Sequence, residues 1–571
     1  MDQKLIDKIY KAWVHQGVVD VDVQAGLAMM HHYNALRRDA FYQHLSFGTS
    51  GLRGVIGAGI NRMNVYVIAR ASQGLADFVT TNFKEDARRI AIAYDTRIKS
   101  DEFARIAAEV FAANGIPVYL YQESMPSPCL SYAVRVLGCA AGIVITASHN
   151  PAEYNGYKIY GSDGCQVTIE ATKVIQQCIN VLDYFEDVKQ MDFNQAVIEG
   201  KIQWIPETVI DGYIDSVKNE SLLRNTLVDK DIRIVYSPLN GAGMKLVCRI
   251  LKECGYSHIT MVEEQTIQDG QFSTCPNPNP EDAEALALGL QYAQRHDADL
   301  LLATDPDCGR MGIALKDEPG EYRLLSANEV GVLLLNYICE RRVALGKMPK
   351  YPVFCKTIVT TDIAQRIASH YGVQTVNTLP GFKFIGEQIG RLEEADRDED
   401  YIFGFEESCG FLSGAYVRDN DGVNAALMIC DMFAWYKTQG IRLCEKLRNL
   451  YAEYGYQFNT QISKRFEGAE GIARMKSIMS RLRGGVADFG GKKVIKCLDY
   501  SQGLEGLPPS NVIKFLLEDN CSTVVRPSGT EPKLKVYLSI CAESETQARV
   551  VADIMEKEIK TFLEQDNTKV I

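Results

Sequence analysis

No stretch of this chain is apolar enough to cross a membrane. Its hydrophobic runs are only a few residues long, as around residues 332–335, whereas a membrane helix needs about 20 residues. Charges at Asp2, Lys4 and Asp7 also interrupt any signal-peptide core at the N-terminus. We therefore expect a cytoplasmic protein with no membrane partner.

Cysteine pairs of the form C-x-x-C are also missing, although the chain contains 16 cysteines. Many of them, including Cys139, Cys339 and Cys430, lie inside apolar runs. This pattern favours reduced cysteines in the core of a cytoplasmic protein over a disulfide framework.

An excess of positive charge is the third missing feature. The 61 Lys and Arg residues are outnumbered by 73 Asp and Glu residues, which gives a formal net charge of −12. Nucleic acids are bound mainly through a basic surface, so this balance argues against a nucleic-acid partner. An anionic small molecule needs only a local concentration of Arg and Lys.

What the chain does contain is the composition of a globular protein, with 46% hydrophobic and 23% charged residues. Its length of 571 residues is too great for one core and fits about three to five domains. An amphipathic opening helix is expected, because apolar residues recur there at helical spacing. These residues are Ile6, Ile9, Tyr10, Trp13 and Val14.

Beyond this helix, short strand-like runs alternate with amphipathic stretches, which predicts an α/β protein with several sheets. The runs lie at residues 90–94, 142–145, 232–236, 300–303, 353–355, 401–403 and 523–525. Breaks near residues 201–208, after Lys316 and around residues 451–456 divide the chain into four units.

The segment 146–151 (TASHNP) follows a short apolar run, and Asn150-Pro151 stops that strand. Ser148 is therefore expected on an exposed turn at the carboxyl end of a buried strand, beside the imidazole of His149. Ligands gather at this edge of open α/β sheets, so Ser148 is a candidate nucleophile. The alternative is an ordinary loop, in which His149 bonds a neighbouring carbonyl group.

The segment 305–310 (DPDCGR) follows the apolar run at 300–303. The alternating carboxylates of Asp305 and Asp307 suit Mg²⁺, which prefers hard oxygen ligands. Arg310 is suited to gripping a phosphate through two hydrogen bonds. The alternative is an ordinary Asp-Pro turn.

Near the C-terminus, the segment 526–532 (RPSGTEP) combines a guanidinium, two hydroxyls and a glycine. This combination favours a phosphate-binding loop over a plain turn. Glu406 and Ser408 follow a strand-like run and offer hydrogen-bonding groups to a hydroxyl-rich ligand, unless they lie on the surface. Lys383 lies in a loop suited to closing over a ring, and two further loops carry Arg53 and Arg97.

Together these motifs resemble the α-D-phosphohexomutase superfamily, and most of all its phosphoglucomutase members. The motifs are FGTSGLRG (47–54), TASHNP with NGYK (146–158), DPDCGR (305–310), GFKFIG (381–386), FEES (405–408) and RPSGTEPK (526–533). They occur in the family's order over almost the whole chain.

The resemblance implies three similar mixed-sheet α/β domains and a C-terminal α+β domain around a central cleft. With the breaks described above, it places the phosphoserine loop in residues 1–206 and the metal loop in residues 207–324. The sugar-binding loop then lies in residues 325–450 and the phosphate-binding loop in residues 451–571.

The resemblance also implies roles for individual residues. Ser148 matches the serine that carries the phosphoryl group and contributes to metal binding, and Asp305 and Asp307 match Mg²⁺ ligands beside Gly309 and Arg310. His149, Lys158 and Arg53 match catalytic positions. The positions that match groups binding the sugar or its distal phosphate are Lys383, Glu406, Ser408, Arg526, Ser528, Gly529 and Thr530.

The implied reaction is a two-step phosphoryl shuttle. Phosphorylated Ser148 donates its phosphoryl group to O6 of glucose 1-phosphate, and the resulting glucose 1,6-bisphosphate turns over and returns its 1-phosphoryl group to the serine. Glucose 6-phosphate is the product, and the bisphosphate is both intermediate and activator. Positioning, Mg²⁺ and cationic groups do most of the work in such transfers.

Two positions depart from the family pattern. Gly309 stands where the metal loop normally carries a third aspartate, and its loss predicts a weaker Mg²⁺ site and a cost of roughly several kcal/mol in transition-state stabilisation. Pro380 replaces the hydroxyl residue that usually precedes the Gly-Phe pair of the sugar loop, which predicts an altered loop or sugar preference.

Three hypotheses therefore stand. The first is an active phosphoglucomutase. The second is a related mutase or synthase, acting on a pentose phosphate or a mannose phosphate or making glucose 1,6-bisphosphate. The third is a catalytically impaired protein that binds a phosphosugar. The oligomeric state is left open.

Overall fold

The computed structural model describes residues 1–17, 20–48, 51–224, 226–317, 321–466, 468–527 and 533–564. The chain divides into two compact units. The first unit comprises Met1–Ala327 and Gly381–Gly440, and the second comprises Asn328–Pro380 and Ile441–Ile571.

The predicted opening helix is confirmed. Helix α1 (Gln3–Gln16) is capped by Asp2, whose side chain accepts a hydrogen bond from the backbone nitrogen of Leu5. The helix buries Ile6, Tyr10 and Trp13. Val14 was expected on the same face but is 48% exposed, because neighbouring positions on a helix point in different directions.

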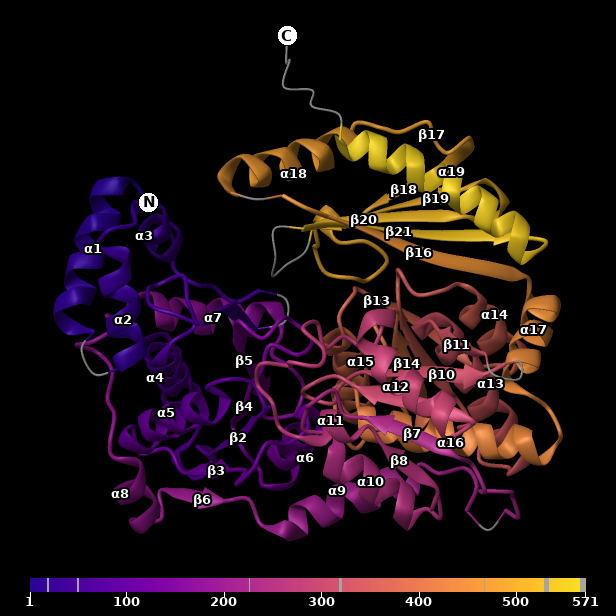
Figure 1. The fold of residues 1–571 in the computed structure, drawn as a ribbon, viewed down its shortest axis with the longest axis horizontal. Coiled ribbons are helices and arrows are strands. Elements are labelled where there is room, and N and C mark those ends of the chain that lie inside the picture. Colours follow the sequence, from indigo (N-terminus) through magenta and orange to yellow (C-terminus); the bar gives the residue numbers. More distant parts are fainter. Residues whose placement is uncertain are drawn as a thin grey trace. The chain divides into compact units, whose positions relative to one another are not determined.

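The first unit begins with three short helices and a six-stranded mixed sheet in the order β1-β5-β4-β2-β3-β6 (Figure 1). Strands β2, β3, β4 and β6 are parallel, whereas β5 is antiparallel to both β4 and β1. Its strands are β1 (Leu52–Val55), β2 (Ile90–Tyr94), β3 (Val118–Leu120), β4 (Ala141–Ile145), β5 (Tyr154–Gly161) and β6 (Ile202–Trp204). Its helices are α2 (Val21–Met30), α3 (Asn34–Phe41), α4 (Val65–Asn82), α5 (Ser100–Ala113), α6 (Ser127–Val136), α7 (Ile169–Asn180) and α8 (Phe193–Ile198).

A second sheet in the first unit has the order β11-β10-β9-β7-β8. Every residue of its central strand β9 is buried, so this strand is a continuous apolar run rather than an alternating one. The strands are β7 (Ile234–Ser237), β8 (Ile259–Met261), β9 (Leu300–Thr304), β10 (Met311–Lys316) and β11 (Tyr322–Leu325). The helices are α9 (Glu207–Asn219), α10 (Met244–Glu253), α11 (Glu263–Thr266) and α12 (Ala283–Arg295).

The rest of the first unit is built around an antiparallel pair of strands, β14 and β15. Helix α15 precedes this pair, and helix α16 follows it. Their bounds are α15 (Phe382–Glu394), β14 (Tyr401–Glu406), β15 (Gly410–Leu412) and α16 (Gly422–Thr438).

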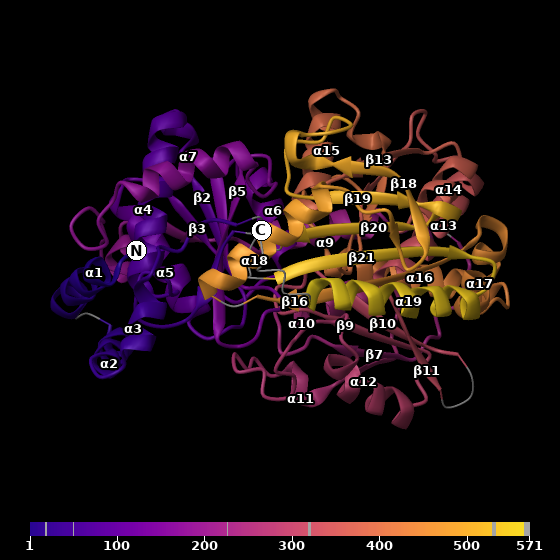
Figure 2. The ribbon, with the colours of Figure 1, turned by 90° about the horizontal axis from the view of Figure 1, so that it is seen from above.

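The second unit contains a parallel pair of strands, β12 and β13, and an antiparallel six-stranded sheet. Figure 2 looks onto this sheet, whose order is β16-β21-β20-β19-β18-β17. Helices α18 and α19 cover one face, and their apolar residues form one core with the strands. The elements are α13 (Ala327–Ala344), β12 (Val353–Thr357), α14 (Ile363–His370), β13 (Gln374–Thr378), α17 (Leu443–Tyr454), β16 (Tyr456–Arg465), α18 (Gly468–Arg483), β17 (Asp488–Phe489), β18 (Lys492–Asp499), β19 (Ile513–Leu517), β20 (Ser522–Pro527), β21 (Lys533–Ala542) and α19 (Glu545–Glu564).

The predicted fold class is confirmed. Each predicted strand-like run falls on a strand, although the run at 232–236 becomes regular only at Ile234. Cys139, Cys339 and Cys430 are buried, and every cysteine is free. Among the described helices, none has the length and apolar character that a membrane crossing requires. The arrangement around a central cleft and the four domain boundaries stay predictions.

Gly74 provides a test of packing between α4 and α7. A Cβ atom at position 74 would lie 2.3 Å from Cγ1 of Ile179 and 2.9 Å from its backbone nitrogen. Gly74→Ala should therefore destabilise the protein by about 1–3 kcal/mol, although Ala is the better helix former. The loss should appear as a lower midpoint of urea unfolding.

The matched control is Gly390→Ala in α15. The nearest atom to a Cβ there is 3.7 Å away, so this change should stabilise the protein by up to about 1 kcal/mol. Equal shifts of the unfolding midpoint in the two variants would contradict the packing described.

Candidate active site

Ser148 lies at the carboxyl end of β4, as predicted, and its backbone is strained. Its φ is 53°, in the left-handed region, which residues other than glycine seldom adopt. The backbone nitrogen of Ser148 donates a hydrogen bond to Oγ1 of Thr146 at 2.8 Å. In α/β-hydrolases, the nucleophilic serine also lies on a strained turn that directly follows a strand.

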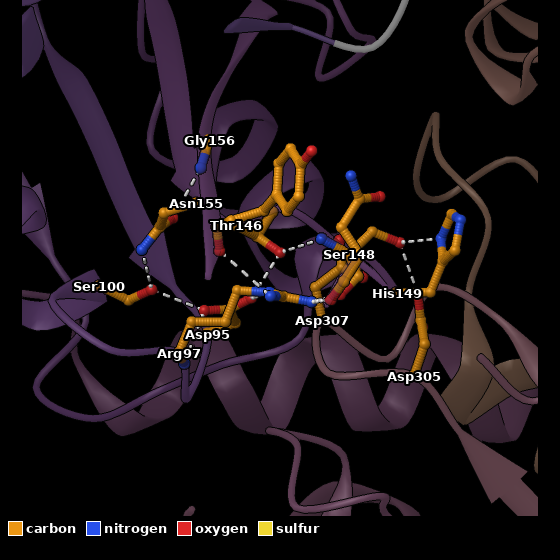
Figure 3. Close-up of polar contacts among 12 residues, drawn as sticks. Asp95, Arg97, Ser100, Thr146, Ser148, His149, Asn155, Gly156, Asp305 and Asp307 are labelled. Atoms are coloured by element: carbon orange, nitrogen blue, oxygen red, sulfur yellow. Dashed lines mark hydrogen bonds and ion pairs between the residues drawn. The ribbon is translucent and has the colours of Figure 1, made fainter. Parts of the chain in front are cut away.

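The prediction that Ser148 is exposed was wrong. The residue is only 6% exposed, because the loop that follows β9 covers it. Its Oγ donates a hydrogen bond of 2.6 Å to Oδ2 of Asp305 and lies 3.2 Å from Nδ1 of His149 (Figure 3). The hydroxyl is therefore held between a carboxylate and an imidazole.

The loop between β9 and β10 brings two carboxylates to this serine. Oδ1 of Asp305 accepts hydrogen bonds from the backbone nitrogens of Gly309 at 3.0 Å and Arg310 at 2.9 Å. Oδ2 of Asp307 accepts hydrogen bonds from Nζ of Lys158 at 2.6 Å and Oγ of Ser127 at 2.8 Å. Lys158 therefore contacts Asp307 and not the serine.

The two carboxyl groups have very different pKa values. Burial and the neighbouring charge of Asp307 raise the pKa of Asp305 to about 7. Burial also acts against the ionised form of Asp307, but the ammonium group of Lys158 overcomes it and lowers the pKa of Asp307 below its usual range. A cation near Asp305 would relieve this repulsion.

The donor set fits a hard divalent cation such as Mg²⁺. Asp305, Asp307 and Ser148 supply only oxygen atoms, as Mg²⁺ prefers. Oδ1 of Asp307 is buried and has no hydrogen-bond partner in the described part of the chain, so it is available as a ligand. Within the described residues, no group of three His, Cys, Asp or Glu side chains converges on a metal position.

The place of the missing third carboxylate is next to Asn420. A Cβ atom on Gly309 would lie 3.0 Å from Nδ2 of Asn420. That nitrogen donates a hydrogen bond of 2.7 Å to the carbonyl oxygen of Gly309. A side chain at position 309 therefore requires a small movement of the Asn420 carboxamide.

Glu406 and Ser408 lie together, with Glu406 buried and Ser408 half-buried, so the surface placement that was the alternative for Glu406 does not hold. Glu406 is 7% exposed, and its Oε1 accepts a hydrogen bond of 2.8 Å from Oγ of Ser408. Burial and the charge of Glu407 raise the pKa of Glu406 to about 7, against the opposing influence of Arg310. Nη1 of Arg310 lies 3.5 Å from both Asn279 and Glu281.

Lys383 lies in the first turn of helix α15 and not in the predicted loop, because the helix begins directly after Gly381, and it is not brought to this cluster. Its side chain lines a cavity of about 230 Å³ together with Asp163, Gln166 and Phe384, and burial lowers its pKa. No hydrogen bond or ion pair links it to Ser148 or Glu406 among the described residues. Its predicted role in sugar recognition stays a prediction.

Arg53 and Arg526 lie on strands, so the prediction that Arg53 lies in a loop was wrong. Arg53 lies on β1, and its Nη1 is 3.4 Å from Oδ1 of Asn150, in the serine loop. Arg526 lies in the second unit, on β20, and donates from Nη2 to the hydroxyl of Tyr537 at 3.2 Å. Ser528, Gly529 and Thr530 fall outside the described residues.

The sequence did not point to several groups that complete the site. Ser127 donates a hydrogen bond to Asp307 although 180 residues separate the two. The available signal in the sequence was its position where a loop ends and a helix begins. Asp95 accepts a hydrogen bond of 2.6 Å from Thr146, and its position just after a strand was the available signal. Nothing in the sequence marked Asn420.

The chain matches known protein families along most of its length. Four models of phosphoglucomutase/phosphomannomutase domains match the chain in order. Alpha/beta/alpha domains I, II and III match residues 44–185, 211–320 and 326–454, and the C-terminal domain matches residues 475–557.

Curated relatives and solved structures agree with these matches. A phosphoglucomutase of Staphylococcus haemolyticus is 36% identical over 516 residues, which is 88% of this chain and 92% of that protein. A phosphoglucomutase of Staphylococcus aureus (strain USA300) is 34% identical over 517 residues, covering 88% and 91%.

Two solved structures share the fold. A phosphoglucomutase/phosphomannomutase family protein from Burkholderia thailandensis has a TM-score of 0.67 at 17% identity, covering 91% of this chain and 98% of its own. The pp63/parafusin phosphoglucomutase from Paramecium has a TM-score of 0.66 at 16% identity, covering 91% and 95%. With domain matches over most of its length and relatives above 30% identity, the chain belongs to the phosphoglucomutase/phosphomannomutase family.

Proposed function

We propose that the protein is a phosphoglucomutase that interconverts glucose 1-phosphate and glucose 6-phosphate through a phosphorylated Ser148. The observation that carries this proposal is the 2.6 Å hydrogen bond from Oγ of Ser148 to Asp305, made from a strained turn. Curated relatives named phosphoglucomutase support the choice of sugar.

In this proposal Ser148 is the phosphoryl carrier. In the forward step the bond between its Oγ and phosphorus breaks, a bond forms between O6 of the sugar and phosphorus, and the O6 proton passes to the site. The Nδ1 atom of His149 lies 3.2 Å from Oγ, and we assign this imidazole to accepting the O6 proton. The return step reverses these bonds at O1 of glucose 1,6-bisphosphate.

Asp305 and Asp307 would hold Mg²⁺ together with the serine or its phosphoryl group. Bound Mg²⁺ supplies positive charge that offsets the negative charge of the transferring group. Lys158 holds the carboxylate of Asp307 in place through a 2.6 Å contact. Arg53 lies beside the serine loop and would add positive charge there.

Glu406 and Ser408 would bind the sugar hydroxyls. The carboxylate accepts hydrogen bonds from hydroxyls, and the serine both donates and accepts. The distal phosphate would be held by Arg526 and residues 528–530, and Lys383 would take part in sugar recognition. Groups that bind hydroxyls and groups that bind a phosphate are both needed for a bisphosphate that must bind in two orientations.

A second candidate is a phosphosugar-binding protein with little mutase activity. It is favoured by Gly309, which leaves the metal loop with two carboxylates, one of them already paired with Lys158. Loss of a metal ligand weakens both metal affinity and charge stabilisation in the transition state.

Ser148→Ala should abolish turnover of glucose 1-phosphate in the presence of glucose 1,6-bisphosphate and Mg²⁺. We expect kcat to fall by at least about a thousandfold, because the atom that carries the phosphoryl group is gone. A coupled assay for glucose 6-phosphate measures this. Mannose 1-phosphate and ribose 1-phosphate are tested as alternative substrates through their own products, mannose 6-phosphate and ribose 5-phosphate.

The control is Ser131→Ala, which removes another buried hydroxyl of the same domain, one that donates to Gly164. This variant should keep its activity. Unchanged turnover in Ser148→Ala would refute the phosphoserine mechanism.

Gly309→Asp should tighten Mg²⁺ binding and raise kcat, since it restores a charged oxygen ligand to the loop. Gly309→Asn is the matched control, because it has the same shape without the charge and disturbs Asn420 equally. Titration calorimetry with Mg²⁺ and steady-state kinetics should separate the two variants. Equal behaviour would show that the missing carboxylate does not limit the enzyme.

Glu406→Gln should change the pH dependence of stability. The pKa of Glu406 is about 7 in the folded protein and lies above the ordinary 4.5. Between pH 4.5 and pH 7, Glu406 is therefore protonated in the folded protein and ionised in the unfolded chain. Stability is therefore lost as pH rises through this window. Since Gln cannot ionise, Tm of the variant minus Tm of the wild type should be more positive at pH 8 than at pH 5.

Ser408→Ala is the control, because it keeps the titrating carboxyl group and removes only its partner. The hydroxyl of Ser408 lowers the pKa of Glu406, so without it the loss of Tm with rising pH should persist or grow. A difference between Glu406→Gln and wild type that does not vary with pH would contradict the raised pKa.

A further inference from the structure

Arg97 is a buried arginine whose side chain is devoted to the serine loop. Its Nη2 donates to the carbonyl oxygens of Ser148 and Asn150. Its Nη1 donates to the carbonyl oxygens of Pro151 at 2.8 Å and Tyr154 at 3.1 Å. One guanidinium group therefore holds four carbonyl groups within the segment 148–154.

Asp95 lies beside Arg97 and holds the same loop through Thr146 (Figure 3). Its Oδ2 lies 3.3 Å from Nε of Arg97 and accepts a hydrogen bond of 2.6 Å from Oγ1 of Thr146. That hydroxyl oxygen in turn accepts a hydrogen bond of 2.8 Å from the backbone nitrogen of Ser148. The backbone N–H and C=O of Ser148 are thus both held by one ion pair, directly or through Thr146.

The ion pair has no access to solvent and is closed off by a second loop. The side chains of Asp95 and Arg97 are both 0% exposed. The guanidinium lies over the ring of Phe272, 4.9 Å from its centroid. A Cβ atom on Gly270 would lie 2.6 Å from the backbone nitrogen of Ile98, so the loop at 270–272 packs tightly on the segment that carries Arg97.

We infer that Arg97, through its contacts with the carbonyl groups of the serine loop and with Asp95, is the positioning residue that keeps Ser148 in its left-handed, strained conformation. The inference rests on the proposed function of Ser148 for its catalytic consequence. A left-handed non-glycine residue costs on the order of 1–3 kcal/mol and persists only where its surroundings enforce it. Four hydrogen bonds from a planar cation and the relay to the backbone nitrogen supply that enforcement.

Phosphoryl transfer makes this positioning consequential. Catalysis of this reaction depends almost wholly on where the reacting oxygen is held, and a displacement of about 1 Å can reduce the rate about a hundredfold. Lysine cannot replace arginine here, because one ammonium group cannot reach carbonyl groups on both branches of the guanidinium fork.

Arg70 offers a control that separates positioning from stability. It is also buried, donates to the carbonyl oxygens of Leu182 and Asn180, and lies over the ring of Tyr184 at 4.4 Å. Arg70→Lys therefore removes the same kinds of contact in the same domain, but away from Ser148.

The experiment compares Arg97→Lys with Arg70→Lys in the full-length chain. Arg97→Lys should reduce kcat for glucose 1-phosphate about a hundredfold or more, with KM changed less than about threefold, whereas Arg70→Lys should keep kcat. Thr146→Val, which cuts only the relay to the backbone nitrogen of Ser148, should also lower kcat and leave KM unchanged. It serves as the test if Arg97→Lys does not fold.

Amide hydrogen exchange of residues 146–156 gives a readout that does not depend on activity. Faster exchange there in Arg97→Lys or Thr146→Val, and not in Arg70→Lys, supports the inference. A wild type that fails to convert glucose 1-phosphate would refute only the proposed function, and the exchange result would still decide the inference. Wild-type exchange in this segment, or equal losses of kcat in Arg97→Lys and Arg70→Lys, would overturn the inference.

Discussion

The hydrogen bond from Ser148 to Asp305 is the contact on which the site depends. It joins two loops that are 157 residues apart in the chain, each following a strand that is buried along its whole length. Both loops lie at the carboxyl ends of their strands. Packing the two sheets with these ends facing each other therefore brings the hydroxyl and the carboxylate together. The loops thus carry the reactive side chains, and the buried strands fix the positions of the loops.

The balance of buried charge explains both the strength and the weakness of this site. Three carboxylates, those of Asp95, Asp305 and Asp307, are buried near Arg97 and Lys158. Each of these two cations is paired with one carboxylate, and although the charge of Arg310 favours ionised Asp305, burial and Asp307 still raise the pKa of Asp305 to about 7. A third loop carboxylate at position 309 would add to the need for positive charge, and the glycine there leads us to expect a weaker attraction for a divalent cation.

The parts of the site that the sequence predicted are those set by local pattern. The apolar run before Ser148 and the proline after it determine where the strand ends, and the same holds for the run before Asp305. Glu406 and Ser408 were singled out because they follow a strand-like run, and the structure joins them by a hydrogen bond.

The parts that could not be predicted depend on tertiary contacts. Ser148 looked exposed because a turn residue usually is, and only the packing of the second loop buries it. Ser127 and Asn420 reach the loop at 305–310 from distant segments, and no local pattern encodes such pairs. Arg97 was visible as an arginine in a loop, but its bonds to four carbonyl groups depend on how segment 148–154 folds back over it.

The most direct test of the account is the phosphorylation of Ser148 itself. The intact mass of the protein should be measured before and after incubation with glucose 1,6-bisphosphate and Mg²⁺, and the modified residue should be mapped by peptide fragmentation. The account predicts the gain of one phosphoryl group on Ser148, and loss of that group on addition of glucose 1-phosphate. A protein that gains no phosphoryl group, or gains it on another residue, would contradict the account.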